Sequence, residues 1–159
     1  MLNQEIIAKE RVYGAHHYDP IPVVLTRGQG VWVWDVEGNK YLDAMSGYSS
    51  INHGHAHPKL VQAAQKQMET LSMTSQAFFT DRLLPFFEIL CQISGMERVL
   101  AMNTGAEAVE TAIKAARKWG YDVKGIPDNK GEIIVANNNF HGRTTTIVSF
   151  SSSQKAYEG

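Results

Sequence analysis

The stretch RVLAMNTGAEA, residues 98–108, decides the fold expected for this chain. Residues 98–102 have the apolar character of a buried strand, and the turn at 103–105 leads into a long helix. Small and apolar residues recur on one face of that helix: Ala106, Val109, Ile113, Ala116 and Gly120. A second apolar run follows at 132–136. Strand, helix and strand form a βαβ unit, which predicts an α/β fold with a mainly parallel sheet.

The first half of the chain predicts smaller elements. Three short strands are expected, at residues 23–25, 31–34 and 40–42. Turns at 28–30 and 37–40 would join them into an antiparallel meander. Helices are expected at residues 3–13, 58–71 and 81–94, with a loop from Ser46 to His57 before the second. We therefore expect a small α+β N-terminal segment over residues 1–50 and the beginning of a larger, incomplete domain over residues 51–159.

The composition of the chain excludes several classes of protein and of site. The 159 residues include 15 Lys and Arg against 16 Asp and Glu, so the net charge of -1 does not favour nucleic acid or an anionic membrane as a partner. No apolar run approaches the roughly 18 residues of a membrane span. The N-terminus lacks the pattern of a secretory signal. The single cysteine, Cys91, excludes an internal disulfide and a cysteine-rich zinc site. We expect a cytoplasmic protein.

The start of the long helix is a candidate anion site. Backbone N–H groups at a helix start point toward an anion, and Gly105 and Ala106 permit its close approach. Thr104 adds a hydroxyl donor. The alternative is a plain N-cap, with Thr104 as the capping residue and Glu107 at the spacing of a capping box. No Gly-Lys-Ser/Thr sequence follows, so this is not a P-loop.

A second candidate follows the strand expected at 132–136. Residues just beyond the carboxyl end of a parallel strand face the ligand crevice of such sheets. The Phe140 ring could stack on a flat cofactor, and Arg143 could bind a carboxylate through two parallel hydrogen bonds. The alternative is that Phe140 fills the core and Arg143 pairs with a surface acid.

Histidines and tyrosines supply weaker candidates. The alternating histidines at 53, 55 and 57 fall in an expected loop without an evident carboxylate partner, so we expect no metal site. Tyr18 and Tyr48 also lie in expected loops. A phenol there can reach a ligand, although most loop tyrosines only pack against their neighbours.

Together these segments resemble the class III aminotransferases, which are pyridoxal-phosphate-dependent enzymes of fold type I. Six segments carry the resemblance: Tyr13–Tyr18, Val33–Gly38, Ser46–Pro58, Met102–Ala108, Ala116–Tyr121 and Asn139–Thr144. Each segment alone is modest evidence for the family. The same segments in the family's order and spacing, from about residue 13 to the C-terminus, are strong evidence. Within the family the match is closest to members that act on ornithine. The Phe-His-Gly-Arg run also occurs in members that act on acetylornithine or 4-aminobutyrate.

The resemblance implies pyridoxal 5'-phosphate as the cofactor. Thr104, Gly105 and Ala106 would hold its phosphate group, and Phe140 would stack on its ring. No catalytic residue is assigned, because the lysine that forms the Schiff base with the cofactor in this family is expected beyond position 159. The chain is therefore expected to be an N-terminal portion of such an enzyme and inactive alone. It should also leave apolar residues of the two expected strands exposed.

The resemblance also implies the substrates and partners. Arg143 would bind the α-carboxylate of 2-oxoglutarate or glutamate. Tyr18 and Tyr48 would line the substrate pocket, with Tyr18 at the α-end of ornithine. The expected partners are these small molecules and either a second copy of the full-length protein in a homodimer or a C-terminal partner chain. A non-catalytic fragment that acts only in assembly remains the alternative.

Overall fold

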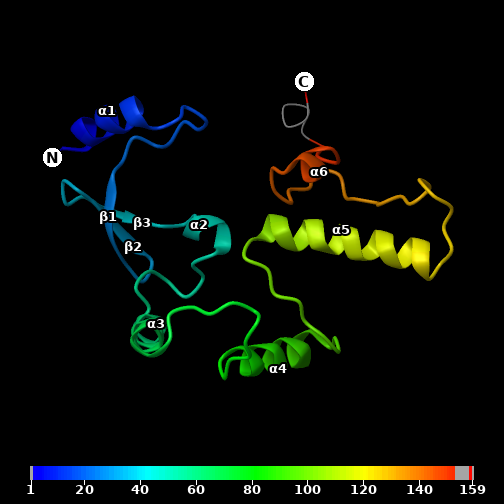
Figure 1. Cartoon of the computed structure of the whole chain (residues 1–159). Helices are drawn as coiled ribbons and strands as arrows, with labels where there is room; N and C mark the ends of the chain where they lie inside the picture. Colours follow the sequence, from blue (N-terminus) through cyan, green and yellow to red (C-terminus); the bar gives the residue numbers. More distant parts are fainter. Residues whose placement is uncertain (1, 153–157, 159) are drawn as a thin grey trace. The chain divides into compact units, whose positions relative to one another are not determined.

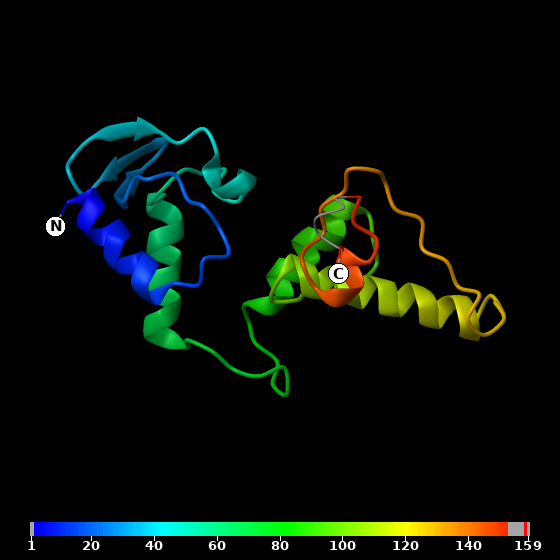
Figure 2. The ribbon, with the colours of Figure 1, turned by 90° about the horizontal axis from the view of Figure 1, so that it is seen from above.

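The computed structural model describes residues 2–152 and 158. The chain divides into two compact units, Met1–Phe78 and Phe79–Gly159. Figure 1 shows the elements of both units along the colour gradient, and Figure 2 shows the same ribbon from above. This division follows the contacts within the chain and does not define evolutionary or functional domains. The domain boundary expected after residue 50 therefore stays a prediction.

The first unit contains the three-stranded antiparallel sheet that the sequence predicts. Its strands are β1 (Leu25–Gln29), β2 (Trp32–Asp35) and β3 (Lys40–Leu42), paired in that order. The expected positions of the first strand and of its turn were wrong: the strand was expected at residues 23–25 but spans Leu25–Gln29, so the turn predicted at 28–30 begins later. Gly28 and Gln29 belong to β1, and the chain reverses at Gly30, whose φ of +56° suits glycine.

The carboxylate of Asp35 organises this unit. Asp35 lies at the end of β2 with only 2% of its surface exposed. Its oxygens accept hydrogen bonds from the Glu37 N–H at 3.0 Å, the Asn39 N–H at 2.8 Å and the Tyr41 hydroxyl at 2.9 Å. The side-chain amides of Asn39 and Asn3 each donate another at 3.0 Å. A single side chain thereby closes the β2–β3 turn and reaches the N-terminal helix.

Helix α1 (Asn3–Tyr13) is attached to the sheet through its first residue. Besides donating to Asp35, the Asn3 side chain accepts a hydrogen bond from the Val24 N–H at 2.8 Å, and its backbone N–H donates to Glu37 at 2.9 Å. None of the residues of α1 is buried. The apolar residues Ile6 and Ile7 of α1 are only half-buried, so the start of the helix is held by the hydrogen bonds of Asn3 and not by a fully buried apolar face. Figure 1 shows α1 at one end of the small sheet and α3 (Pro58–Thr70) at the other.

The second unit contains α4 (Leu83–Ser94), α5 (Gly105–Asp122) and the short α6 (Thr145–Val148). Helix α4 ends at Gly95 in a left-handed conformation with φ of +70°. Helix α6 lies beside the first part of α5 in both ribbon views and buries Ile147, which is 1% exposed. In the described part of the chain, no helix is long and apolar enough to cross a bilayer.

The two strands expected at 98–102 and 132–136 are not formed in the structure. A strand needs a neighbour to complete its backbone hydrogen bonds, and neither stretch pairs with another among the described residues. The parallel pairing expected for the βαβ unit is therefore absent from the described part of the chain. As expected, apolar side chains of both stretches are exposed, including Leu100 at 66% and Ile134 at 97%.

We predict that Asp35→Asn lowers the thermal stability of the first unit at neutral pH. Burial opposes the charge and raises the pKa of Asp35, but hydrogen bonds from Asn39, Asn3 and Tyr41 outweigh it and hold the pKa well below its ordinary range. The pKa is thus lower in the folded chain, so the charge stabilises the fold above the unfolded value of about 4. The stabilisation by the Asp35 charge is lost as the pH falls from the pKa of the unfolded chain toward the lower pKa of the folded chain.

Thermal unfolding followed by circular dichroism between pH 2 and pH 7 measures this effect. The difference in Tm between the wild type and Asp35→Asn should be largest above about pH 4 and shrink at lower pH. Asp19→Asn is the control, because the Asp19 side chain is 97% exposed, and it should leave Tm unchanged. A difference that does not depend on pH would contradict the role given to the charge.

Candidate functional site

The N-terminus of α5 has the donor set of an anion site. Thr104 caps the helix, since its hydroxyl accepts a hydrogen bond from the Glu107 N–H at 3.1 Å. The plain N-cap considered from the sequence is therefore present. The N–H groups of Gly105 and Ala106 donate to no acceptor among the described residues. A Cβ added to Gly105 would meet no atom within 4 Å. Two donors and open space fit a phosphate group.

The segment after residue 136 packs against this helix start. A Cβ on Gly142 would lie 3.0 Å from the Ala106 Cβ and 3.3 Å from a methyl of Ile147, and Gly142 has a φ of +129°. The Thr144 hydroxyl donates to the Glu110 carboxylate at 2.6 Å. Two stretches that the sequence singled out separately are thus adjacent in the structure.

Phe140 and Arg143 lie together on this segment. The Arg143 guanidinium carbon is 5.8 Å from the centre of the Phe140 ring, and Phe140 is 73% exposed. The alternative role of Phe140 as a core residue does not hold in this structure. Arg143 forms no ion pair within the described residues. Both side chains retain the surfaces with which a flat ring and a carboxylate can be bound.

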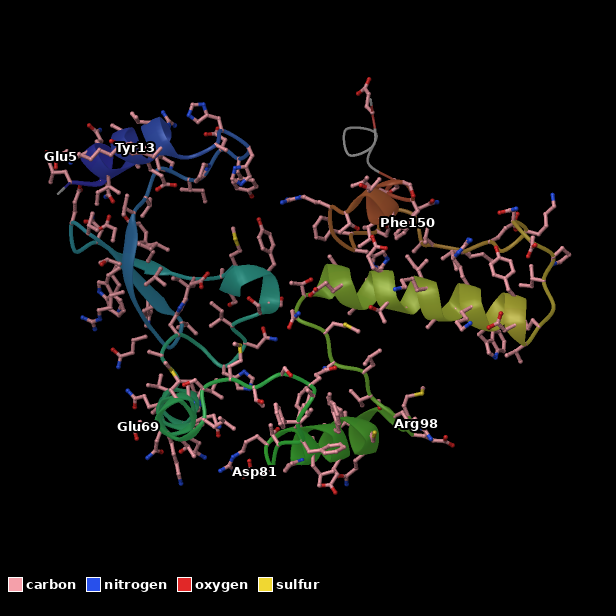
Figure 3. The ribbon with its side chains drawn as sticks, in the orientation of Figure 1. Glu5, Tyr13, Glu69, Asp81, Arg98 and Phe150 are labelled. Carbon is pink, nitrogen blue, oxygen red and sulfur yellow. The ribbon has the colours of Figure 1, made fainter. Side chains whose placement is uncertain are left out.

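The backbone that carries Phe140 is fixed at its base. The Asn139 side-chain amide donates to the carbonyl oxygens of Ala136 at 2.8 Å and Phe150 at 3.1 Å. The rings of His141 and Phe150 pack edge to face, with their centres 5.9 Å apart. Figure 3 labels Phe150 beside α6. These contacts close residues 136–150 into one loop against α5.

The two tyrosines expected at the substrate pocket meet in the first unit. Their hydroxyl oxygens are 3.1 Å apart, and Tyr18 and Tyr48 are 59% and 77% exposed. Tyr18 also lines a cavity of about 870 Å³ between α1 and residues 14–25. The sequence placed both residues in loops but gave no sign that they would touch. A pair of adjacent phenols can share hydrogen bonds with one polar ligand group.

The loop expected from Ser46 to His57 begins with a left-handed turn, α2 (Ser46–Ser49), which carries Tyr48. The φ angles of Ser46, Gly47, Tyr48 and Ser49 are all positive, between 49° and 68°. A left-handed conformation costs about 1–2 kcal/mol for each residue with a Cβ. Strain of this kind persists only where surrounding contacts impose it.

Asp43 and His55 provide a contact next to this turn that the sequence did not reveal. The His55 Nε2 and a carboxylate oxygen of Asp43 are 2.7 Å apart. The hydrogen bond from His55, assisted by one from the Ser46 N–H, holds the pKa of the Asp43 carboxyl below its ordinary value. The expectation that these histidines lack a carboxylate partner was therefore wrong for His55.

The remaining histidines of the alternating run do not add ligands to this pair. The rings of His53 and His57 pack edge to face at 6.2 Å, and the His57 Nδ1 is buried without a hydrogen-bond partner among the described residues. No group of three or more His, Cys, Asp or Glu in the described chain has the arrangement of a metal site.

Comparisons with known proteins identify the family of the chain. Residues 13–159 match the family model of the class-III aminotransferases. The ornithine aminotransferase of Geobacillus sp. (strain WCH70) is 56% identical over 155 residues, which are 98% of this chain and 39% of that protein. The ornithine aminotransferase structure from Toxoplasma gondii aligns with a TM-score of 0.95 at 43% identity, over 99% of this chain and 37% of that one. An acetylornithine aminotransferase structure from Elizabethkingia anophelis aligns with a TM-score of 0.83 at 52% identity, over 96% and 38% respectively.

The chain belongs to the class III aminotransferases, and these comparisons confirm the fold type I class expected from the sequence. Pyridoxal phosphate is the cofactor of this family, and it partially occupies the active site of the Toxoplasma gondii protein. The chain spans about 39% of the length of the curated relatives it matches.

We predict that Gly142→Ala destabilises the second unit by about 2–3 kcal/mol. A side chain at this φ is strained, and the added Cβ would press on Ala106 and Ile147. Urea unfolding followed by circular dichroism gives the free energy. Gly125→Ala is the control for an added Cβ in open space: Gly125 has a φ of +67° and no atom lies within 4 Å of an added Cβ, so this change should cost only about 1 kcal/mol. Equal losses in both variants would contradict the packing of Gly142 on α5.

Proposed function

We propose that this chain is the N-terminal part of an ornithine aminotransferase. The whole enzyme would transfer the δ-amino group of L-ornithine to 2-oxoglutarate, giving glutamate 5-semialdehyde and glutamate in two half-reactions. The observation that carries the proposal is the packing of the 139–144 segment on the first turn of α5. Among the described residues, this packing brings together a helix start with two N–H groups that donate to no acceptor, an exposed aromatic ring and a guanidinium that forms no ion pair.

The residues at α5 fit the cofactor of the family. Thr104, Gly105 and Ala106 would bind its phosphate group through a hydroxyl and two backbone N–H donors. The exposed face of Phe140 would pack on its ring. Bound there, pyridoxal phosphate would supply the electron sink that amino-group transfer requires. The chain's own contribution is to hold and orient this group.

Arg143 and the tyrosine pair would bind the two substrates. The planar guanidinium of Arg143 matches the α-carboxylate of 2-oxoglutarate or glutamate in a bidentate geometry. Tyr18, supported by the contact of its hydroxyl with that of Tyr48, would hold the α-end of ornithine. The δ-amino group would then be the end presented to the cofactor.

A second candidate function is transamination of acetylornithine. The 52% identity to the acetylornithine aminotransferase structure from Elizabethkingia anophelis favours it. Transamination of 4-aminobutyrate is a third candidate, and a fragment that acts only in assembly is a fourth. Comparing ornithine, acetylornithine and 4-aminobutyrate as amino donors for the reconstituted protein separates the three enzymatic candidates. The cytoplasmic location and the homodimer of the full-length protein also stay proposals.

We predict that the chain alone does not turn over ornithine, and that turnover appears when it is combined with a polypeptide supplying the remaining length of its relatives. The chain spans only about 39% of those relatives, and the lysine that the family resemblance places beyond position 159 would come from the second polypeptide. The assay measures glutamate formed from ornithine and 2-oxoglutarate with added pyridoxal phosphate. Turnover by the chain alone would contradict the proposed dependence. A folded complex without turnover would favour the assembly role.

We predict that Tyr18→Ile in the reconstituted protein selectively weakens the ornithine half-reaction. Loss of a hydrogen bond to a charged group should cost about 1.5–3 kcal/mol of transition-state stabilisation, which is seen as a lower kcat/KM for ornithine. The kcat/KM of the glutamate half-reaction should not change. Single-turnover absorbance changes with each amino donor measure the two effects. Tyr13→Ile is the control, because Tyr13 lies in α1, is 89% exposed and has no proposed role. Equal losses for ornithine and glutamate would contradict the assignment of Tyr18.

We predict the opposite selectivity for Arg143→Lys. A lysine retains the charge but cannot form two parallel hydrogen bonds with a carboxylate. The half-reaction with 2-oxoglutarate should therefore slow, and the ornithine half-reaction should change less. The same single-turnover assay measures both rates. Slowing confined to ornithine would remove Arg143 from the proposed site.

A further inference from the structure

The contact between the Tyr18 and Tyr48 hydroxyls depends on the conformation of α2. Tyr48 lies in the middle of this left-handed turn, with φ and ψ of 56° and 49°. The Ser46 carbonyl accepts a hydrogen bond from the Ile51 N–H at 3.0 Å, and the Ser50 hydroxyl donates to the Gly47 carbonyl at 2.7 Å. These local bonds close the turn but do not attach it to the sheet. A side-chain contact links the turn to the sheet.

Asp43 supplies that contact. One oxygen of its carboxylate accepts hydrogen bonds from the Met45 N–H at 3.1 Å and the Ser46 N–H at 2.8 Å, at the entrance of the turn. The other oxygen faces the His55 Nε2 at 2.7 Å. The side chains of Asp43 and His55 are 18% and 23% exposed, so both are largely shielded from water. Asp43 thus joins the start of the turn to His55.

His55 is itself fixed to the sheet. Its backbone N–H donates to the Gly30 carbonyl at 2.8 Å, and its carbonyl accepts from the Gly30 N–H at 2.9 Å. The ring lies directly over Gly28 in β1, where an added Cβ would be 2.6 Å from the His55 Cγ. A chain of contacts therefore runs from β1 through His55 and Asp43 to the turn that carries Tyr48.

We infer that Asp43 and His55 are positioning residues that hold the Tyr48 hydroxyl against that of Tyr18 and thereby shape the pocket for the ornithine α-end. The contact chain carries the first part of this inference. The second part rests on the proposed function, because it needs the tyrosine pair to bind substrate.

Nuclear magnetic resonance of the chain labelled with ¹³C at the tyrosine Cζ tests the positioning. Tyr48→Phe defines how far the Tyr18 signal moves when the hydroxyl contact is lost. His55→Ala should move the Tyr18 signal by at least about half of that displacement. His55→Gln, whose amide can still donate to Asp43, should return the signal toward the wild-type position. Glu69→Gln on α3, whose labelled side chain in Figure 3 takes no part in these contacts, should leave it unchanged.

The indole signal of Trp34 in β2 shows whether each variant keeps its sheet. If the Trp34 signal shows that His55→Ala does not form the sheet, Asp43→Asn is measured in its place. The asparagine side-chain oxygen can still accept hydrogen bonds from the Met45 and Ser46 N–H groups, but the carboxylate that faces His55 is removed. A Tyr18 signal that stays in place in a variant with an intact sheet would overturn the inference. Equal displacement in His55→Gln and His55→Ala would also overturn it.

Steady-state kinetics of the reconstituted protein test the link to substrate. His55→Ala should raise KM for ornithine about fivefold to tenfold with kcat changed less than about twofold, and KM for 2-oxoglutarate should stay the same. A displaced Tyr18 signal without a change in KM for ornithine would overturn the proposed role of the tyrosines in ornithine binding, while the positioning by Asp43 and His55 would stand. The two measurements therefore distinguish a failure of the positioning by Asp43 and His55 from a failure of the proposed ornithine binding by the tyrosines.

Discussion

The buried charge of Asp35 is the interaction on which the N-terminal unit depends. A carboxylate shielded from water is tolerated only when its oxygens are fully hydrogen bonded. The five donors that satisfy Asp35 come from the first residue of α1, the turn after β2 and the hydroxyl of Tyr41. Because α1 contributes no fully buried residue, the hydrogen bonds of Asn3 attach its first turn to the sheet where a buried apolar side chain would do so in other helices.

The second unit is organised differently, around close approach of backbone to backbone. Gly142 and Ala106 are small, so the loop that carries Phe140 and Arg143 can lie directly on the first turn of α5. Helix α6 covers the contact with Ile147. The same small residues that permit packing also leave the N–H groups of the helix start accessible. Structural and binding requirements therefore act on the same few positions.

Much of this arrangement could be predicted from the sequence, and the exceptions have physical causes. The meander and the helices at α3, α4 and α5 follow from local patterns of Pro, Gly and apolar residues. Strands at 98–102 and 132–136 could not be decided locally, because a strand forms only with a neighbour. Asp43 and His55 are twelve positions apart. They meet only because the backbone of His55 pairs with that of Gly30, which brings the loop to the sheet, and no local sequence pattern predicts this pairing.

The left-handed turn at α2 has a consequence for how this surface tolerates sequence change. Ser49 is exposed, and an exposed position is ordinarily open to almost any residue. Its φ of 68° is accessible to glycine and asparagine but is a severe outlier for valine or isoleucine. In a saturation library, Ser49 should therefore accept fewer amino acids than its exposure suggests. The backbone imposes on a surface residue the kind of selectivity that packing imposes in a core.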